Sequence, residues 1–334
     1  MDYINYVKQQ PMTGFTGFGG GAASLQFHEG AGDGSYSAAP YGGAGPSTRA
    51  VTGGGYVPGS PFDSNIMNYF TVASPGNATD FGDLSHIRQD MGAVSNGPRG
   101  VYGGGHGGGE QDIVDYITIA STGNATDFGD LTQARHGIYG ISNDTRGIFV
   151  GGTTSPKNVM DYITIASTGN ATDFGDYNDD TTRNPGAVND HVRGVIACSG
   201  THANAGGKLE YITIATTGDS SDFGDLNWNL SLGAGASNTT TGIFIQGSTS
   251  PGKAMDWITI QTLGDGADFG DLIVTGSMTK ATGSDTRLVR FGAAPFDNVI
   301  EYVTYASTSN AVDFGNLTYS ASAVAGTSNG HGGL

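Results

Sequence analysis

Residues 115–132 read DYITIASTGNATDFGDLT, and residues 161–177 repeat them almost letter for letter as DYITIASTGNATDFGDY. The first part places aromatic and β-branched side chains at alternate positions, which is typical of a β-strand. The second part carries the string DFGD. A unit that recurs at a fixed interval indicates a repeat architecture, so the number and spacing of the copies decide the fold.

Six copies of the DFGD string, some imperfect, occur between residue 48 and the end of the sequence. Their phenylalanines are 45–49 residues apart: Phe81, Phe128, Phe174, Phe223, Phe269 and Phe314. An alternating strand precedes each copy, with its aromatic at Tyr69, Tyr116, Tyr162, Tyr211, Trp257 and Tyr302. Each unit also holds an apolar run that ends in glycine, such as GVYGG, and a run of small residues, such as GAVSN. No helical period is present.

Four short strands in each of six units predict an all-β fold, a six-bladed β-propeller with four-stranded blades. The small-residue strand should be innermost, because strands near the axis are crowded by their symmetry mates. The DFGD segment should be outermost and lead into the next blade. The first copy begins at Thr48 with its second strand, so we expect the spare strand at residues 321–329 to pair beside Val51. That pairing closes the ring and removes two exposed sheet edges; residues 35–41 are the rival for this place.

The repeat resembles the kelch repeat, in which a glycine-doublet strand precedes an acidic-aromatic pair and a rim aromatic. The doublets are Gly53-Gly54, Gly103-Gly104 and Gly151-Gly152, and the last three copies keep only one glycine. The rim aromatic is phenylalanine here, where kelch repeats usually have tryptophan. The resemblance implies a kelch-like propeller over residues 48–334, closed by its C-terminal strand, and supports the fold more than any kelch partner.

Residues 1–47 do not follow the repeat and are rich in glycine, alanine, serine and proline. We interpret them as an extended N-terminal arm that docks on a neighbouring protein through its aromatic rings. The alternative is a disordered or self-packed leader. The rings expected to dock are those of Tyr3, Tyr6, Phe15, Phe18 and Phe27.

Composition limits the partners. Acidic residues outnumber basic ones 31 to 14, and the resulting net charge of −17 argues against a nucleic-acid partner. No apolar run is long enough for a transmembrane helix, and the first residues lack a signal-peptide core, so no membrane insertion is expected. The lone Cys198 lies in the apolar run GVIACSG and is expected to be buried.

One repeat position holds five of the nine arginines, namely Arg49, Arg99, Arg146, Arg193 and Arg287. We expect this column to pair with repeated aspartates such as Asp127 and Asp130. Calcium at those carboxylates, or at Asp176, Asp179 and Asp180, is the alternative. The other arginines, Arg88, Arg135, Arg183 and Arg290, do not match one another in position. The Asn-Ala-Thr strings at Asn77, Asn124 and Asn170 are interpreted as turns rather than glycosylation sites.

The motifs that suggest an enzyme lack their context, and we predict no enzyme, no catalytic residue, no cofactor and no metal. DFG occurs without the other kinase motifs. The glycines around His106 open no helix, as a phosphate-binding loop would. HExxH and GxSxG are absent. A sialidase or lyase would need clustered arginines on one face, and the unmatched arginines do not predict such a cluster. The loops between second and third strands vary from copy to copy and should share one face.

The repeat also resembles tandem strings in virion structural proteins of marine tailed phages, particularly those that infect cyanobacteria. That resemblance rests on DYITIASTGNATDFGDLT and on the leader FTGFGGGAASL. It implies a component of the virion, assembled in the host cytoplasm, with the propeller on the tail, a fibre or the capsid surface. The arm would bind other virion proteins, and the propeller could contribute to adhesion to a host-surface glycan. The alternative is a free glycan-binding propeller lectin.

Overall fold

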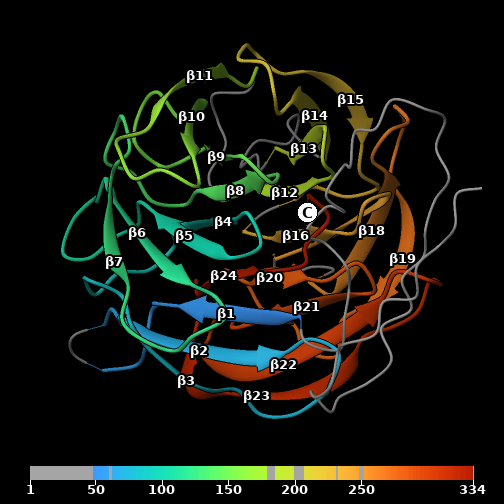
Figure 1. Cartoon of the computed structure of the whole chain (residues 1–334). Coiled ribbons are helices and arrows are strands. Elements are labelled where there is room, and N and C mark those ends of the chain that lie inside the picture. Colours follow the sequence, from blue (N-terminus) through green and yellow to red (C-terminus); the bar gives the residue numbers. More distant parts are fainter. Residues whose placement is uncertain are drawn as a thin grey trace, which may run out of the picture. The chain divides into compact units, whose positions relative to one another are not determined.

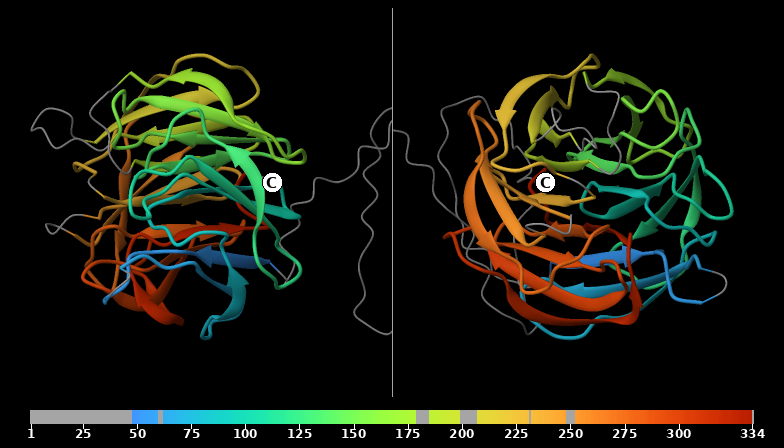
Figure 2. Two further views of the ribbon diagram at one scale, coloured as in Figure 1. Left: turned by 90° about the vertical axis from the view of Figure 1, so that its left-hand side faces the viewer. Right: turned by 180° about the vertical axis from the view of Figure 1, so that it is seen from behind.

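The computed structural model describes residues 48–59, 62–178, 185–198, 207–230, 232–247 and 252–333. Within these ranges every regular element is a β-strand, and the 24 strands form six antiparallel sheets of four strands each. The sheets stand side by side in a ring (Figures 1 and 2). The predicted six-bladed β-propeller is therefore confirmed. Residues 1–47, with Tyr3, Tyr6, Phe15, Phe18 and Phe27, lie outside the described residues.

The four strands of each blade follow one another from the axis to the rim. From innermost to outermost, blade 1 consists of β24 (Ala325–Ser328), β1 (Arg49–Gly53), β2 (Ile66–Thr71) and β3 (Thr79–Asp83). Blade 2 consists of β4 (Gly92–Ser95), β5 (Arg99–Gly103), β6 (Ile113–Thr118) and β7 (Thr126–Asp130). Blade 3 consists of β8 (Tyr139–Ser142), β9 (Arg146–Val150), β10 (Val159–Thr164) and β11 (Thr172–Asp176).

The other three blades repeat the same order. Blade 4 consists of β12 (Gly186–Asn189), β13 (Arg193–Ala197), β14 (Lys208–Thr213) and β15 (Ser221–Asp225). Blade 5 consists of β16 (Ala234–Ser237), β17 (Thr241–Ile245), β18 (Ala254–Thr259) and β19 (Ala267–Asp271). Blade 6 consists of β20 (Lys280–Gly283), β21 (Arg287–Phe291), β22 (Asp297–Thr304) and β23 (Val312–Ala321).

The ring closes as the phase of the repeat predicts. The C-terminal strand β24 pairs antiparallel with β1, and Val51 lies opposite Thr327. Blade 1 thus combines the last strand of the sequence with three strands that begin at Arg49. Since β24 occupies the inner position, residues 35–41 are not needed there.

The small-residue strands line the axis, as expected. Their neighbours around the ring are one another: β4 contacts β8 and β24, and β16 contacts β12 and β20. Because the strands alternate in direction, each blade presents two ends. We call the turn face the end that carries the turns after inner strands, such as 96–98, and the hairpins before outer strands, such as 119–125. The loop face carries the loops between second and third strands, such as 104–112.

Apolar side chains fill the space between neighbouring blades. The rim phenylalanines are buried, and Phe128 packs with Val114, Leu131 and Ile163 in one such cluster. In five blades the rim phenylalanine meets the strand aromatic edge to face, for example Tyr116 and Phe128 with ring centroids 6.1 Å apart. Cys198 is buried, as expected. The part of the chain described contains no helix with the length and apolar character needed to span a bilayer.

Candidate functional site: the blade junctions and the axis

The DFGD segment of each blade is hydrogen-bonded to the hairpin of the next blade. At the junction of blades 2 and 3, the Gly169 amide donates to the Phe128 carbonyl at 2.8 Å, and the Ala171 amide donates to the Asp130 carbonyl at 2.7 Å. The Asn170 side-chain oxygen accepts from the Asp130 amide at 3.2 Å. We call these contacts the rim bonds.

All six junctions have the side-chain rim bond. The accepting side chains occupy one repeat position, where four are asparagine and two are aspartate: Asn77, Asn124, Asn170, Asp219, Asp265 and Asn310. The Asn-Ala-Thr strings are therefore turn residues that join blades. The rim bonds also supply the physical reason for the outermost position of DFGD.

The glycine of DFGD is required by this contact. Gly129 has a φ of +147°, and a Cβ there would lie 2.5 Å from the Gly169 carbonyl oxygen. The hairpin of the next blade can approach the outer strand only because that position has no side chain. The aspartate side chains of the motif act differently from expectation, since Asp127 and Asp130 make no side-chain hydrogen bond or ion pair with any residue in the described ranges.

A second set of contacts involves the arginine column, and here the expected pairing with aspartate is wrong. Each of the five guanidinium groups lies over the aromatic ring of its own third strand, with the centre of the group 4.3–4.6 Å from the ring centroid. Each also donates to a backbone carbonyl of the next blade; Arg99, for example, donates to Ile165 at 3.0 Å. We call these contacts arginine bridges. Tyrosine faces and carbonyl oxygens attract a guanidinium without a carboxylate.

Buried Arg–Asp pairs do occur, but they use other arginines. Arg88 and Arg135 hold equivalent positions after the outer strands of blades 1 and 2, contrary to our expectation that they do not match. Arg88 pairs with Asp115 at 2.7 Å, and Arg135 pairs with Asp161 at 2.6 Å, with all four side chains inaccessible to solvent. Burial lowers the pKa of Arg88, and the neighbouring Asp115 carboxylate opposes that shift. Arg183 lies outside the described residues.

The aspartates of these pairs belong to a third column. It contains Asn68, Asp115, Asp161, Glu210, Asp256 and Glu301, all buried on third strands. Each accepts a backbone N–H from the residue four positions after the rim phenylalanine of the preceding blade, as Asp256 does from Asn227 at 2.7 Å. Arg290 reaches the same column from another position and pairs with Glu301 at 3.3 Å. In the sequence, each residue of this column directly precedes the third-strand aromatic. The arginines that pair with it, Arg88, Arg135 and Arg290, do not all occupy one repeat position.

The axis is filled from the loop face by two large residues on inner strands. Tyr139 and Lys280 occupy the first position of β8 and β20, where the other blades have glycine or alanine. The Tyr139 hydroxyl crosses the ring, donates to the Gly235 carbonyl and accepts from the Gly235 amide at 3.0 Å. Burial raises the pKa of Tyr139 to about 12. Lys280 forms a buried ion pair with Asp90 at 3.3 Å.

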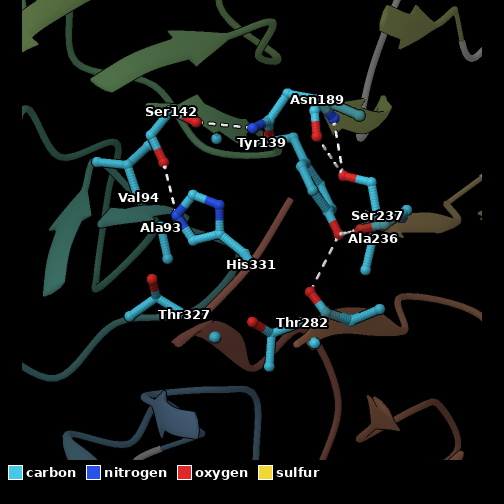
Figure 3. Close-up of a pocket in the computed structure, with 16 residues that line it drawn as sticks. Ala93, Val94, Tyr139, Ser142, Asn189, Ala236, Ser237, Thr282, Thr327 and His331 are labelled. Atoms are coloured by element: carbon cyan, nitrogen blue, oxygen red, sulfur yellow. Dashed lines mark hydrogen bonds between the residues drawn. The ribbon is translucent and has the colours of Figure 1, made fainter. Parts of the chain in front are cut away.

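From the turn face, the C-terminal residues 329–333 enter the same axis (Figure 3). The His331 Nε2 lies 3.2 Å from the Ser95 carbonyl oxygen and 3.2 Å from the Ser142 hydroxyl. The Gly333 amide donates to Nδ1 at 3.1 Å, so the partners define the neutral tautomer with its proton on Nε2. Burial lowers the pKa of His331 to about 4. We call residues 329–333 the axial tail.

The ends of the inner strands are themselves tied together around this tail. Asn189 donates to the Ser142 carbonyl at 2.7 Å, and the Ser237 hydroxyl donates to the Asn189 carbonyl at 2.6 Å. The Ser95 hydroxyl donates to the Ser328 carbonyl at 2.5 Å. What remains of the axis is a cavity of about 50 Å³ and a smaller one of about 10 Å³. These volumes hold a few waters rather than a sugar or a nucleotide.

Outside the axis, two equivalent pockets open on the turn-face hairpins of blades 4 and 5. One has a volume of about 230 Å³ and is lined by Tyr211 and Asp219; the other has about 210 Å³ and is lined by Trp257 and Asp265. On the loop face, His136 lies 2.7 Å from Glu110 and packs against His106. No group of three or more His, Cys, Asp or Glu suited to a metal ion occurs among the described residues. Asp179 and Asp180 are outside them.

No protein-family model matches the chain, and comparison with curated proteins finds no similar sequence. Function must therefore follow from the fold and its contacts. They define a β-propeller whose six blades are joined at the rim, along the third strands and around the axis. The rim positions that sequence reasoning selected are brought together at the junctions, whereas the axial residues Tyr139, Lys280 and His331 were not selected. The sequence did carry a signal for Tyr139 and Lys280, because each is a large residue at a repeat position where the other blades have glycine or alanine.

Proposed function

We propose that this chain is a structural protein of a virus particle, of the kind found in tailed phages. Its propeller would be carried on the tail, a fibre or the capsid surface, and residues 1–47 would attach it to other virion proteins. The observation that supports a structural role most directly is the filled axis. A disc whose centre holds a tyrosine, an ion pair and its own axial tail is suited to rigid display rather than to passing a substrate through the axis.

The blade junctions support the same proposal. Each junction combines rim bonds with the third-strand column, and five also have an arginine bridge. Repeat folds ordinarily depend on contacts between neighbouring units, so added bonds at each contact raise resistance to local opening. Such resistance is useful to a particle component that is exposed outside a cell. The resemblance of the repeat to virion strings agrees with it.

The test is the protein content and shape of purified particles. We expect the chain to co-purify with virions at a fixed copy number and to be visible as discs by cryo-electron microscopy. Deletion of residues 1–47 should release a folded propeller into the supernatant and leave particles without the discs. Virions that lack the protein, with unchanged particles after deletion of its gene, would contradict the proposal.

A second candidate, a glycan-binding propeller lectin, is favoured by the two equivalent hairpin pockets. Each combines an aromatic side chain with an aspartate and threonines, which are groups that bind sugars. A glycan array probed with the full chain tests it. Binding that is lost in a Tyr211→Ala variant would support the lectin, and an array without signal would reject it.

A further inference from the structure

The junction between blades 5 and 6 departs from the other five because it has no arginine. Thr241 stands at the position of Arg49, Arg99, Arg146, Arg193 and Arg287. The aromatic that the arginine would cover is also different, since Trp257 replaces tyrosine. This is the one junction in the described structure where no cation lies over the third-strand aromatic.

The other partners of the missing guanidinium are still present. In blade 2, the carbonyl oxygens of Ile119 and Ala120 accept from Arg49 at 3.1 and 3.0 Å. In blade 1, those of Val72 and Ala73 accept from Arg287 at 3.0 and 2.8 Å. The equivalent carbonyls in blade 6 belong to Tyr305 and Ala306, and neither accepts a hydrogen bond from a described residue. The acceptor pair and the aromatic ring therefore remain without the group that the fold places between them elsewhere.

The surroundings of Trp257 also favour a cation from outside. Trp257 also lines the turn-face pocket of about 210 Å³, together with the exposed Asp265 and Leu263. The equivalent pocket in blade 4 is present beside Tyr211 although Arg193 covers that ring, so the pocket is distinct from the vacant arginine position. One Asp265 oxygen accepts the rim bond from Asp225, and the other has no hydrogen bond within the described ranges. Indole is the strongest cation–π partner among the aromatic side chains, and a net charge of −17 attracts a basic partner.

We propose that this junction binds a guanidinium group supplied by an arginine of a partner protein. The cation would lie on the Trp257 ring and donate to the Tyr305 and Ala306 carbonyls, reproducing the five arginine bridges in trans. The first 47 residues contain no arginine, so the chain's own arm cannot supply the group. The proposal does not depend on the virion role, because it rests only on the geometry of the junction.

The experiment is a titration of the full chain with N-methylguanidinium, followed through the indole N–H signals in ¹H–¹⁵N NMR spectra. Trp228 is the internal control, and N-methylurea is the neutral probe of the same shape. We expect the Trp257 signal to shift saturably with a Kd in the millimolar range, as a single small cation allows. The Trp228 signal should stay in place, and N-methylurea should have at least ten-fold weaker effect.

Two variants make the test decisive. Thr241→Arg should fill the site from within, abolish the N-methylguanidinium shift and raise the thermal midpoint. Its matched opposite, Arg99→Thr, should lower the midpoint and leave the Trp257 titration unchanged. The proposal is overturned by a flat Trp257 titration up to about 50 mM ligand, well beyond a millimolar Kd, or by equal binding to Thr241→Arg. A shift caused by a methyl glucoside but not by the cation would instead assign the pocket to a glycan and also overturn it.

Discussion

Replacing Arg135 by methionine should destabilise the propeller strongly, because it leaves a buried carboxylate without its cation. The Arg135 guanidinium donates to Asp161 at 2.6 Å, to the Gly151 carbonyl at 2.8 Å and to the Phe149 carbonyl at 3.2 Å. Neither side chain of the pair is accessible to solvent. Removing one member of such a pair costs about 3–5 kcal/mol of unfolding free energy. Among the described residues, Asp161 would keep only the Thr132 backbone and hydroxyl donors.

The double variant should recover part of that loss. Blade 1 has the neutral Asn68 at the position of Asp161, where it accepts from the Thr318 amide and hydroxyl at 2.8 Å each. Combining Arg135→Met with Asp161→Asn therefore recreates a neutral joint that the fold already uses. We expect the two single changes and the double change to be non-additive by about 2 kcal/mol or more, within the range that contacting residues show.

The assay is urea unfolding followed by circular dichroism and fluorescence, with the double-mutant cycle evaluated only where the two transitions coincide. Arg146→Met, in the blade that contains Asp161, is the control. Its guanidinium is half-buried, lies over Tyr162 and donates to the Ile214 carbonyl rather than to a charged group, so its loss should cost about 1 kcal/mol. A cost below about 1 kcal/mol for Arg135→Met, or strict additivity of the cycle, would refute the reasoning that this pair is dry and mutually dependent.

Three further predictions concern the rim and the axis. Gly129→Ala should cost at least about 2 kcal/mol, since a Cβ there meets the Gly169 carbonyl, whereas Gly76→Ala, with no atom within 4 Å of the added Cβ, should be nearly neutral in the same urea assay. Asn124→Ala should cost about 1 kcal/mol by removing a rim bond, while Asn124→Asp should be tolerated because Asp219 and Asp265 make that bond in blades 4 and 5; equal losses for both changes would contradict the assignment. The folded protein keeps His331 neutral down to about pH 4, whereas the unfolded chain protonates it near 6.5. Stability relative to a His331→Gln variant should therefore fall by about 1.4 kcal/mol for each pH unit below 6.5 until the axial tail leaves its site. Parallel pH profiles of the thermal midpoints of the two proteins would show that the tail is not bound there.

The strand order of every blade could be predicted from the sequence because it depends on local patterns. Alternating aromatics in β6 and β10, small residues in β4 and glycine at the end of β5 are each properties of one segment, and the period supplies the arrangement. The closing strand β24 followed from counting which strand each copy begins with. The innermost position of β20 was harder to recognise, because Lys280 occupies a place where the other blades have small residues or tyrosine.

Partners across a junction could not be predicted in the same way. The arginine column was recognised in the sequence. Whether its side chains contact Tyr69 and Tyr116 or the DFGD aspartates depends on the face of the blade from which each side chain projects. Arg88 and Arg135 are separated by one repeat length, and their burial against Asp115 and Asp161 becomes apparent only when neighbouring blades meet. The axial tail has no equivalent in the repeat, so His331 gave no periodic signal.

The account of six equivalent blade junctions requires a closed ring. Amide hydrogen exchange of the native protein measures that closure directly. The amides that join β1 to β24, through the hydrogen-bonded pairs Val51–Thr327 and Gly53–Ala325, should exchange as slowly as those between β4 and β5 in a blade that is continuous in sequence. Slow exchange at both places is the result that a closed six-bladed disc predicts. Fast exchange confined to β24 and β1 would show an open ring and contradict it.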